Sequence, residues 1–334
     1  MLARNSEVDE AIHAVRSLEN SFNQWFGYPW VFLNDVEWTA EFKGRVGSEI
    51  TSGGTVTFDT IDSSMWGWPS HFTEDSKTKA RKTWQQWYDS MDEVFQNGTH
   101  VTHDSYHHMC RFNSGFFYDH PALSKYRYYW RVEPDVSFTC RIPYDPFAFM
   151  AREGKKYGYT IALYEVGKLI PSLFRATSGF AAAWSKIHTR RNGLWSAMHD
   201  PSWAPWPIRR FLLSRLAHRN AVGDAWNLCH FWSNFEVADL DFFRGAEYRE
   251  YFAHLDALGG FYHERWGDAP VHSLAAALML EPQQVHYFQD VGYSHPPFQH
   301  CPVGEGVGCG CECDKSAHVG SYCLDRMRQP VEPR

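Results

Sequence analysis

The sequence of 334 residues predicts an α/β fold, with a mixed, mostly parallel central sheet flanked by helices. A short apolar segment at residues 1–3 is typical of the end of a strand. Residues 7–26 carry apolar side chains at spacings of three and four, which predicts an amphipathic helix. The apolar run WVFLND at residues 30–35 predicts a buried strand that ends in a polar loop. Ligands of such sheets bind beyond the carboxyl ends of the strands.

Further regular elements follow from the spacing of apolar and aromatic residues. We expect helices at 77–97 and 273–280, and strands at 126–132, 157–163 and 285–288.

The least regular segment, residues 189–224, combines three tryptophans with three prolines and is predicted to be an insertion or a lid. Because no stretch has the composition of a linker, we expect one domain over residues 1–302. Residues 303–334 are predicted to form an irregular, cysteine-rich tail packed on the same domain.

The amino-acid composition limits the kinds of molecule that the chain is expected to bind. The formal net charge of -7 and the lack of a long basic run argue against a nucleic-acid partner. Aromatic residues make up 17% of the chain, which suits the flat surfaces that bind sugars, although large rings in the core account for most of them. No apolar run is long enough to span a membrane. Since the chain starts directly at a strand end, we expect the natural protein to have residues before Met1.

Eight cysteines are present, five of them in the last 34 residues. Cysteines at this short spacing could bind zinc as thiolates. However, the tail has no CxxC pair, and Cys-x-Cys-x-Cys in a glycine-rich segment favours disulfides formed in an oxidising compartment. The glycosylation triplet Asn97-Gly98-Thr99 is compatible with a secretory route.

The stretch YYWRVEPDV, residues 128–136, places two carboxylates at the end of an apolar run. Pro134 marks a strand end, because proline cannot donate to a strand ladder. In extended backbone, Glu133 and Asp135 would project to the same side, where a divalent cation bound to phosphate could neutralise them. A plain turn explains Pro134-Asp135 equally well. A further ligand to the metal would be imidazole or oxygen.

Two other carboxylates lie beside aromatic residues. Glu236 ends the run CHFWSNFE, where apolar surroundings would raise its pKa if it had no partner. Asp268 precedes a helix that Pro270 could open. The simpler alternatives are that Glu236 forms an ion pair and that Asp268 is only a helix N-cap. No P-loop and no GxGxxG motif occurs, so metal-assisted departure of a nucleotide diphosphate is the simplest mechanism left.

Seven motifs in order resemble the fungal α-1,2-mannosyltransferases of glycosyltransferase family 15, from LARN near the start to about Pro302. The motifs are HHMCRFNSGFF, YYWRVEPDV, YDPFAFM, YGYTIALYE, NLCHFWSNFEVADLDFFR, GGFYHERWGDAPVHSLAAALML and GYSHPPFQHCP. The resemblance implies a GT-A type catalytic domain that uses GDP-mannose as donor, a mannose-terminated acceptor and manganese, with retention of anomeric configuration. It further implies a Golgi lumenal domain behind an N-terminal membrane anchor, with a role in protein glycosylation and cell-wall mannan.

The resemblance also assigns roles to residues. Glu133 and His295 would hold the metal, while Glu236 would be the nucleophile or stabilise the oxocarbenium ion. Asp268 would line the same pocket. The residues assigned to the nucleotide or its diphosphate are Tyr106, Arg4, Arg111 and Asp135, the last of which could also reach the metal through water. Residues 189–224 depart from the family pattern and are expected to alter the acceptor side.

Two other functions compete with this reading. A glycoside hydrolase could use Glu236 and Asp268 as its carboxylate pair and would need neither metal nor nucleotide. An inactive carbohydrate-binding relative could keep the fold without the reaction. The cysteine tail leaves a third, weaker possibility, a zinc protein.

Overall fold

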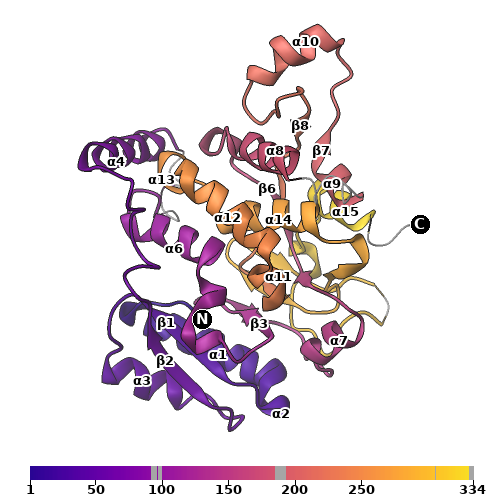
Figure 1. Cartoon of the computed structure of the whole chain (residues 1–334). Coiled ribbons are helices and arrows are strands. Elements are labelled where there is room, and N and C mark those ends of the chain that lie inside the picture. Colours follow the sequence, from indigo (N-terminus) through magenta and orange to yellow (C-terminus); the bar gives the residue numbers. More distant parts are fainter. Residues whose placement is uncertain (92–95, 97–99, 185–192, 305, 331–334) are drawn as a thin grey trace.

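The structure is a computed structural model that describes residues 1–91, 96, 100–184, 193–304 and 306–330 (Figure 1). It is an α/β fold in which short sheets are covered by helices. The strands are β1 (Trp30–Asn34), β2 (Val56–Thr60), β3 (Tyr128–Arg131), β4 (Ser137–Phe138), β5 (Tyr157–Tyr159), β6 (Ala162–Tyr164), β7 (His199–Asp200), β8 (Ala225–Trp226), β9 (Cys229–Phe231), β10 (Glu236–Asp239), β11 (Val285–Tyr287), β12 (Tyr293–His295) and β13 (Phe298–His300).

Helices connect and cover these strands. The α-helices are α1 (Val8–Leu18), α2 (Gln24–Phe26), α3 (Ala40–Gly47), α4 (Glu74–Asp89), α6 (Asp104–Gly115), α7 (Pro146–Arg152), α8 (Leu173–Ala183), α9 (Gly193–Met198), α10 (Trp206–Phe211), α11 (Leu240–Arg244), α12 (Ala246–Leu258), α13 (Gly260–His263), α14 (Asp268–Met279) and α15 (Tyr322–Arg328). A π-helical turn, Glu19–Asn23, joins α1 to α2.

The N-terminal part is built as the sequence predicts. Leu2 bridges Leu33 in parallel, α1 follows with a buried apolar face, and β1 then pairs in parallel with β2. The predicted helix at 77–97 corresponds to α4, and the glycosylation triplet at 97–99 lies outside the described residues. The predicted strands at 126–132 and 285–288 correspond to β3 and β11.

The expectation of a mostly parallel sheet is wrong. The central sheet has the order β11-β5-β10-β3, and within it only β5 and β11 run parallel. Of the eight strand pairs in the described residues, only this one and β1 with β2 are parallel. The parallel pattern read from the first 35 residues therefore does not extend to the strands that follow.

The single strand predicted at 157–163 is in fact two strands. β5 belongs to the central sheet, whereas β6 pairs with β9 in a separate two-stranded sheet. Thr160 and Ile161 lie between them, and Ile161 accepts a backbone hydrogen bond from Trp232. The chain thus changes sheets within a run that is apolar throughout, which an alternation pattern cannot reveal.

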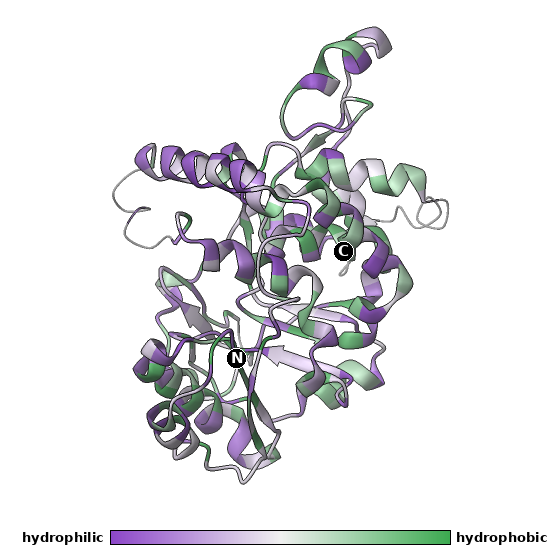
Figure 2. Cartoon of the chain, turned by 60° about the vertical axis from the view of Figure 1, so that its left-hand side comes forward, coloured by the Kyte–Doolittle hydropathy of each residue, from purple (hydrophilic) through white to green (hydrophobic). Residues whose placement is uncertain are grey.

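Two apolar cores lie on the two sides of the central sheet. One contains buried side chains of α1, β1 and α3 together with Val237 of β10 and Phe288. The other is formed largely by α8, α12 and α14, with Ala238 of β10 pointing into it. Successive residues of β10 therefore face opposite cores, as the period of two along a strand requires. Apolar segments run through the interior of the molecule in Figure 2.

Disulfides near the C-terminus confirm the preferred reading of the cysteines. Bonds join Cys140 to Cys311, Cys229 to Cys323, and Cys301 to Cys313. All three tie the tail, residues 303–334, to earlier parts of the chain, and six of the eight cysteine sulfurs are therefore not available as zinc ligands. The division at residue 302 stays a prediction. Among the described residues, none of the helices has the length and apolarity needed to cross a bilayer.

Candidate active site

Glu133 and Asp135 lie directly after β3, in the turn around Pro134. Glu133 is half-buried and forms an ion pair with Arg131, the last residue of β3. Asp135 is exposed and has a left-handed backbone, with φ 64°. The extended geometry assumed for this pair is therefore wrong at Asp135, and the turn interpretation is correct. The two carboxylates are distinct: Glu133 faces the protein, whereas Asp135 faces solvent.

His295 is brought to the same edge by strand pairing. β12 runs antiparallel to β4, with Ser294 opposite Ser137. Continuing this register by one residue places His295 beside Val136, next to the turn that carries Asp135. The imidazole packs against Trp232, at 5.2 Å between ring centroids. The two predicted metal ligands thus come from neighbouring chain segments.

Arg131 joins the acidic groups of the site. Its guanidinium donates to Glu133 and to Asp268, and Asp268 also accepts a hydrogen bond of 2.6 Å from Ser233 Oγ. Burial acts to raise the pKa of Asp268, but the positive charges of Arg131 and His272 outweigh it and the pKa is lowered. Asp268 is the first residue of α14, whose N-cap is Gly267, so the plain N-cap interpretation is wrong.

Glu236 is fully buried and bonded to a histidine. Its Oε2 lies 2.8 Å from His272 Nδ1, and His272 Nε2 donates to the backbone oxygen of Asn113 at 2.9 Å. Burial raises the pKa of Glu236, and the interaction with His272 only partly offsets this. Since both ring nitrogens face acceptors, the pair holds a proton between imidazole and carboxylate. The second carboxylate oxygen, Oε1, has no hydrogen-bond partner among the described residues.

Strand pairing explains why Glu236 and Arg131 lie close to Asp268 and His272. Glu236 stands opposite Arg131 in the antiparallel pair of β10 with β3. Residues directly opposite each other project to the same face of a sheet. Asp268 and His272 lie four residues apart on α14, which puts both on one helix face. The Arg131–Asp268 contact and the His272–Glu236 contact are therefore two links between that helix face and the sheet.

Tyr106 belongs to a second buried polar group. Its hydroxyl accepts a hydrogen bond of 2.7 Å from Arg265, which is also ion-paired at 2.5 Å with Glu165. Burial, together with the nearby charges of Cys110 and Glu165, raises the pKa of Tyr106 against the opposing effect of Arg265. The thiol of Cys110 lies close enough to Tyr106 and to Asp268 to interact with both. Tyr106 and Asp268 thus both interact with Cys110.

The two arginines predicted to bind the nucleotide have different surroundings. Arg4 is partly exposed and donates to Ser105 Oγ at 3.3 Å, beside Tyr106. Arg111 is buried, donates twice to Asp256, at 2.6 and 2.8 Å, and once to the backbone oxygen of Gly67. Its guanidinium is occupied within the protein, so the geometry gives Arg111 a structural role and does not support contact with a nucleotide.

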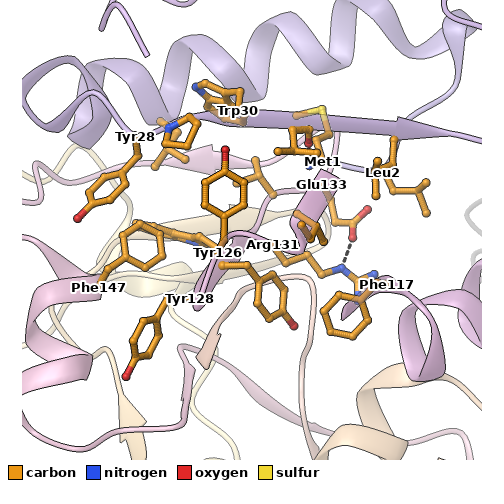
Figure 3. A pocket seen from close by; sticks show the side chains of 18 of the residues that line it. Met1, Leu2, Tyr28, Trp30, Phe117, Tyr126, Tyr128, Arg131, Glu133 and Phe147 are labelled. Carbon is orange, nitrogen blue, oxygen red and sulfur yellow. Dashed lines mark hydrogen bonds and ion pairs between the residues drawn. The ribbon is translucent and has the colours of Figure 1, made fainter. Parts of the chain in front are cut away.

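A cavity of 470 Å³ lies between β1 and β3 (Figure 3). Figure 3 shows aromatic side chains on both walls, with Trp30 on the β1 side and Tyr128 and Phe147 opposite. Arg131 and Glu133 stand at one end. Because phosphates are bound by charged or amide donors and not by aromatic walls, only this polar end belongs to the candidate site.

Sequence reasoning missed four residues of the site: Arg131, Ser233, His272 and Arg265. Two of them carried a usable signal. Arg131 is two residues before Glu133, near the end of the strand predicted at 126–132. His272 is four residues after Asp268, directly before the helix predicted at 273–280. Extending each element by a few residues would place either pair on one side. The contacts of Ser233 and Arg265 depend on the approach of distant segments and have no local signal.

Comparison with known proteins identifies the family. The model described as glycolipid 2-alpha-mannosyltransferase matches residues 1–326. The O-glycoside alpha-1,2-mannosyltransferase homolog 4 of Schizosaccharomyces pombe is 43% identical over 331 residues, covering 94% of this chain and 71% of the relative. The glycolipid 2-alpha-mannosyltransferase of Saccharomyces cerevisiae is 39% identical over 316 residues, covering 94% of this chain and 64% of the relative.

Solved structures agree with the sequence matches. Core-mannan synthase A (CmsA/Ktr4) of Aspergillus fumigatus, in its Mn/GDP form, superimposes with a TM-score of 0.82 at 36% identity, over 99% of this chain and 83% of that one. The mannosyltransferase Ktr4p of S. cerevisiae in complex with GDP gives 0.81 at 36% identity, over 97% and 77%. The chain belongs to the glycolipid 2-alpha-mannosyltransferase family, glycosyltransferase family 15, and is a glycosyltransferase.

Proposed function

We propose that this chain is a retaining α-1,2-mannosyltransferase with a GT-A type fold, which transfers mannose from GDP-mannose to the 2-hydroxyl of a mannose-terminated acceptor. The acceptor would be an O-linked or N-linked glycan of a glycoprotein. The observation that carries the proposal is the cluster around Arg131, whose guanidinium forms ion pairs with both Glu133 and Asp268, residues of two separate motifs. The related structures with GDP and with Mn/GDP support the choice of nucleotide and metal.

The residues present fit a manganese ion. Glu133 supplies a carboxylate just after β3, and His295 supplies an imidazole from β12, which pairs with β4, the next strand along the chain; oxygen and imidazole are both metal ligands. When bound there, the ion would neutralise charge on the diphosphate of the leaving group. Asp135, exposed beside this edge, is placed to bond a water molecule or the sugar of the nucleotide.

The chain's own residues would orient the donor and stabilise charge. Arg131 fixes Glu133 and keeps Asp268 ionised, so that negative charge faces the region where the sugar reacts. Glu236 would supply the carboxylate that meets positive charge at the anomeric carbon, either as a nucleophile or by electrostatic stabilisation. His272 orients Glu236 and shares its proton.

The location of the enzyme follows from the same assignment. We propose that this chain acts in the Golgi lumen, behind a membrane anchor that precedes it in the full-length protein. Three disulfides support an oxidising compartment, because such bonds persist in secretory compartments and are rare in the cytosol.

An assay of GDP release tests the proposal. GDP-mannose is supplied with mannose, α-methyl mannoside or short manno-oligosaccharides, with and without Mn²⁺, and the linkage of the product is determined. We expect metal-dependent release of GDP and an α-1,2 linkage. The variant Glu236→Gln should lose several orders of magnitude in turnover and keep donor binding. Near-normal turnover of that variant would contradict the role of Glu236.

The same assay addresses the competing hydrolase. The pKa values of Glu236 and Asp268 are shifted in opposite directions, as they are in the acid and base pair of a glycosidase. A hydrolase would release mannose from α-mannosides in EDTA without GDP. That result, with no release of GDP under any condition, would replace the transferase proposal.

A further inference from the structure

Residues 201–224, here called the tryptophan arm, project from the body of the molecule. The arm contains α10 and is closed at its base by the antiparallel pair β7 and β8, in which His199 stands opposite Trp226. Figure 1 shows α10 at the top, beyond β7 and β8, far from β1 and β3 at the other end. The arm is therefore accessible to a partner without obstruction by the rest of the chain.

The arm has a defined internal structure. Arg209 donates to Asp224 Oδ1 at 2.7 Å and to the backbone oxygen of Val222 at 3.2 Å. Gly223 has φ +87° and packs on Arg209, where a Cβ atom would lie 2.8 Å from the backbone oxygen. At the base, Arg175 of α8 donates to the backbone oxygen of Leu216 at 3.2 Å. These contacts fix α10 against the returning chain, so the arm presents a stable surface.

The surface of the arm is unusually apolar. Trp203 is 95% exposed and Trp206 60%. Of the fifteen large apolar side chains that are exposed in the described part of the chain, seven lie in this arm: Trp203, Trp206, Ile208, Phe211, Leu212, Leu216 and Val222. Since exposed apolar surface of this kind is rare on monomeric proteins unless it binds something, the arm is an interaction surface.

The charge of the arm is opposite to that of the chain. Residues 201–222 contain four arginines and no aspartate or glutamate, whereas the whole chain has a net charge of -7. Arg209 is neutralised by Asp224, but Arg210 and Arg215 are exposed and form no ion pair with the described residues. The guanidinium of Arg210 stacks on Trp206 at 5.0 Å. Cationic and aromatic groups thus share one surface. A complementary partner would present anionic groups beside apolar surface.

We propose that the tryptophan arm inserts its apolar tip into the interfacial region of a phospholipid membrane, where Arg210 and Arg215 contact headgroup phosphates. Tryptophan is enriched at the boundary between headgroups and acyl chains, and arginine beside it contacts anionic headgroups. A protein groove that bound these apolar side chains would leave Arg210 and Arg215 to be desolvated, whereas a bilayer interface keeps them in contact with phosphate. The candidate site lies next to β3, which is distant from α10 of the arm in Figure 1.

Vesicle co-sedimentation of the purified chain tests this directly. Vesicles of phosphatidylcholine alone are compared with vesicles that contain about 30% phosphatidylserine, at low and high salt. We expect partitioning onto both kinds of vesicle, with tighter binding to the anionic vesicles that weakens as salt is added. The readout does not depend on GDP-mannose or on turnover, so it distinguishes failure of this proposal from failure of the proposed transferase activity.

Paired variants separate the two parts of the surface. Trp203→Ala with Trp206→Ala removes apolar insertion, and Arg210→Glu with Arg215→Glu reverses the charge. Each arginine near an anionic surface contributes about fivefold to partitioning, so the charge-reversal variant should bind at least roughly 25-fold more weakly. The matched controls are Trp25→Ala, an exposed tryptophan outside the arm, and Lys79→Glu with Lys82→Glu on α4. Both controls should bind like the unmodified chain.

The binding of the arm variants and their controls either supports or overturns the membrane proposal. Loss of binding in both arm variants, with unchanged thermal unfolding and controls that bind normally, supports the proposal. No binding to either kind of vesicle, or arm variants that bind normally, would overturn it. No binding to either vesicle, combined with arm-dependent binding to an acidic glycoprotein acceptor, would assign the arm to a protein partner and equally reject the membrane.

Discussion

At the scale of single residues, Arg131 holds the candidate site together. It is the cation shared by Glu133 and Asp268, and its side chain is largely buried. Buried ion pairs add little net stability when complete, but removal of one partner leaves an uncompensated charge in a low-dielectric environment. The function of Arg131 is thus to make two nearby carboxylates compatible with folding.

The variant Arg131→Met should therefore be costly to stability as well as to activity. We expect the free energy of unfolding to fall by about 3–5 kcal/mol, because Asp268 then loses its cation. Denaturant titration measures the loss. The control is Arg16→Met, which removes a solvent-exposed pair with Glu49 and should have no measurable effect. Equal stability of the two variants would show that Arg131 does not neutralise the site.

The Glu236–His272 pair predicts a dependence on pH. Burial raises the pKa of Glu236, and the positive charge of His272 opposes that shift. Asp268 acts in the same direction as burial, and the ring of Tyr248 lies 6.0 Å from that of His272. If the ionised carboxylate is the active form, activity rises as the pH passes through the pKa of Glu236.

Substitution of His272 should move the acid limb of the pH profile. In His272→Gln the pKa of Glu236 rises further because the opposing cation is gone, so the acid limb of kcat should shift to higher pH. The comparison is with His286→Gln, a largely buried histidine on β11 whose side chain packs on Phe149. A lower kcat with an unchanged pH profile would mean that His272 is only structural.

At the scale of elements, local patterns predicted helices and the first strands well, but not how later strands pair. The periodicity of residues 7–26 gave α1, and the run at 30–35 gave β1, because each needs only neighbouring residues. The direction of β10 against β3 depends on a contact more than one hundred residues apart in sequence. The parallel arrangement at the N-terminus does not extend to these strands, which pair antiparallel.

In the candidate site, too, single residues can be predicted from the local sequence, whereas their contacts cannot. Glu133, Glu236 and Asp268 could be selected because each carboxylate stands at the edge of an aromatic or apolar run. Their partners depend on the tertiary fold: Glu236 meets His272 through the packing of α14, and Asp268 meets Arg131 across the same interface. Arg111, chosen from a motif alone, instead joins α6 to α12 through Asp256.

The tail helix α15 depends on one disulfide for its attachment. Cys323 of α15 is bonded to Cys229 of β9, and the neighbouring Leu324 and Met327 enter the core. Serine at both cysteines should lower the free energy of unfolding by about 2–5 kcal/mol, because the bond closes a long segment of chain. Calorimetry with the disulfides intact elsewhere measures this.

The unpaired Cys309 offers a control for that experiment. It is half-exposed and not disulfide-bonded, so Cys309→Ser should leave thermal unfolding almost unchanged. If the double variant at Cys229 and Cys323 unfolds at the same temperature as the Cys309 variant, apolar packing alone holds α15, and the disulfide contributes little.

At the scale of the whole molecule, the two cores and the disulfides provide a rigid body, and the proposed nucleotide site lies at its surface. Ligands that bind only the folded state raise its stability by mass action. GDP with Mn²⁺ at about one hundred times the dissociation constant should add about 2.7 kcal/mol, or a rise in Tm on the order of 5 °C. Differential scanning calorimetry with GDP, Mn²⁺ and both together measures the rise.

Two variants then separate ligand binding from general stability. Glu133→Ala should reduce the extra rise that Mn²⁺ gives to GDP, because the ion loses a ligand. Arg111→Met should lower Tm without ligand, since Asp256 loses its bidentate partner, yet keep the same rise on adding GDP and Mn²⁺. If Arg111→Met abolishes the rise and Glu133→Ala preserves it, the assignments are reversed: the nucleotide would then bind beside α6, and the edge formed by β3 and β12 would not be the metal site.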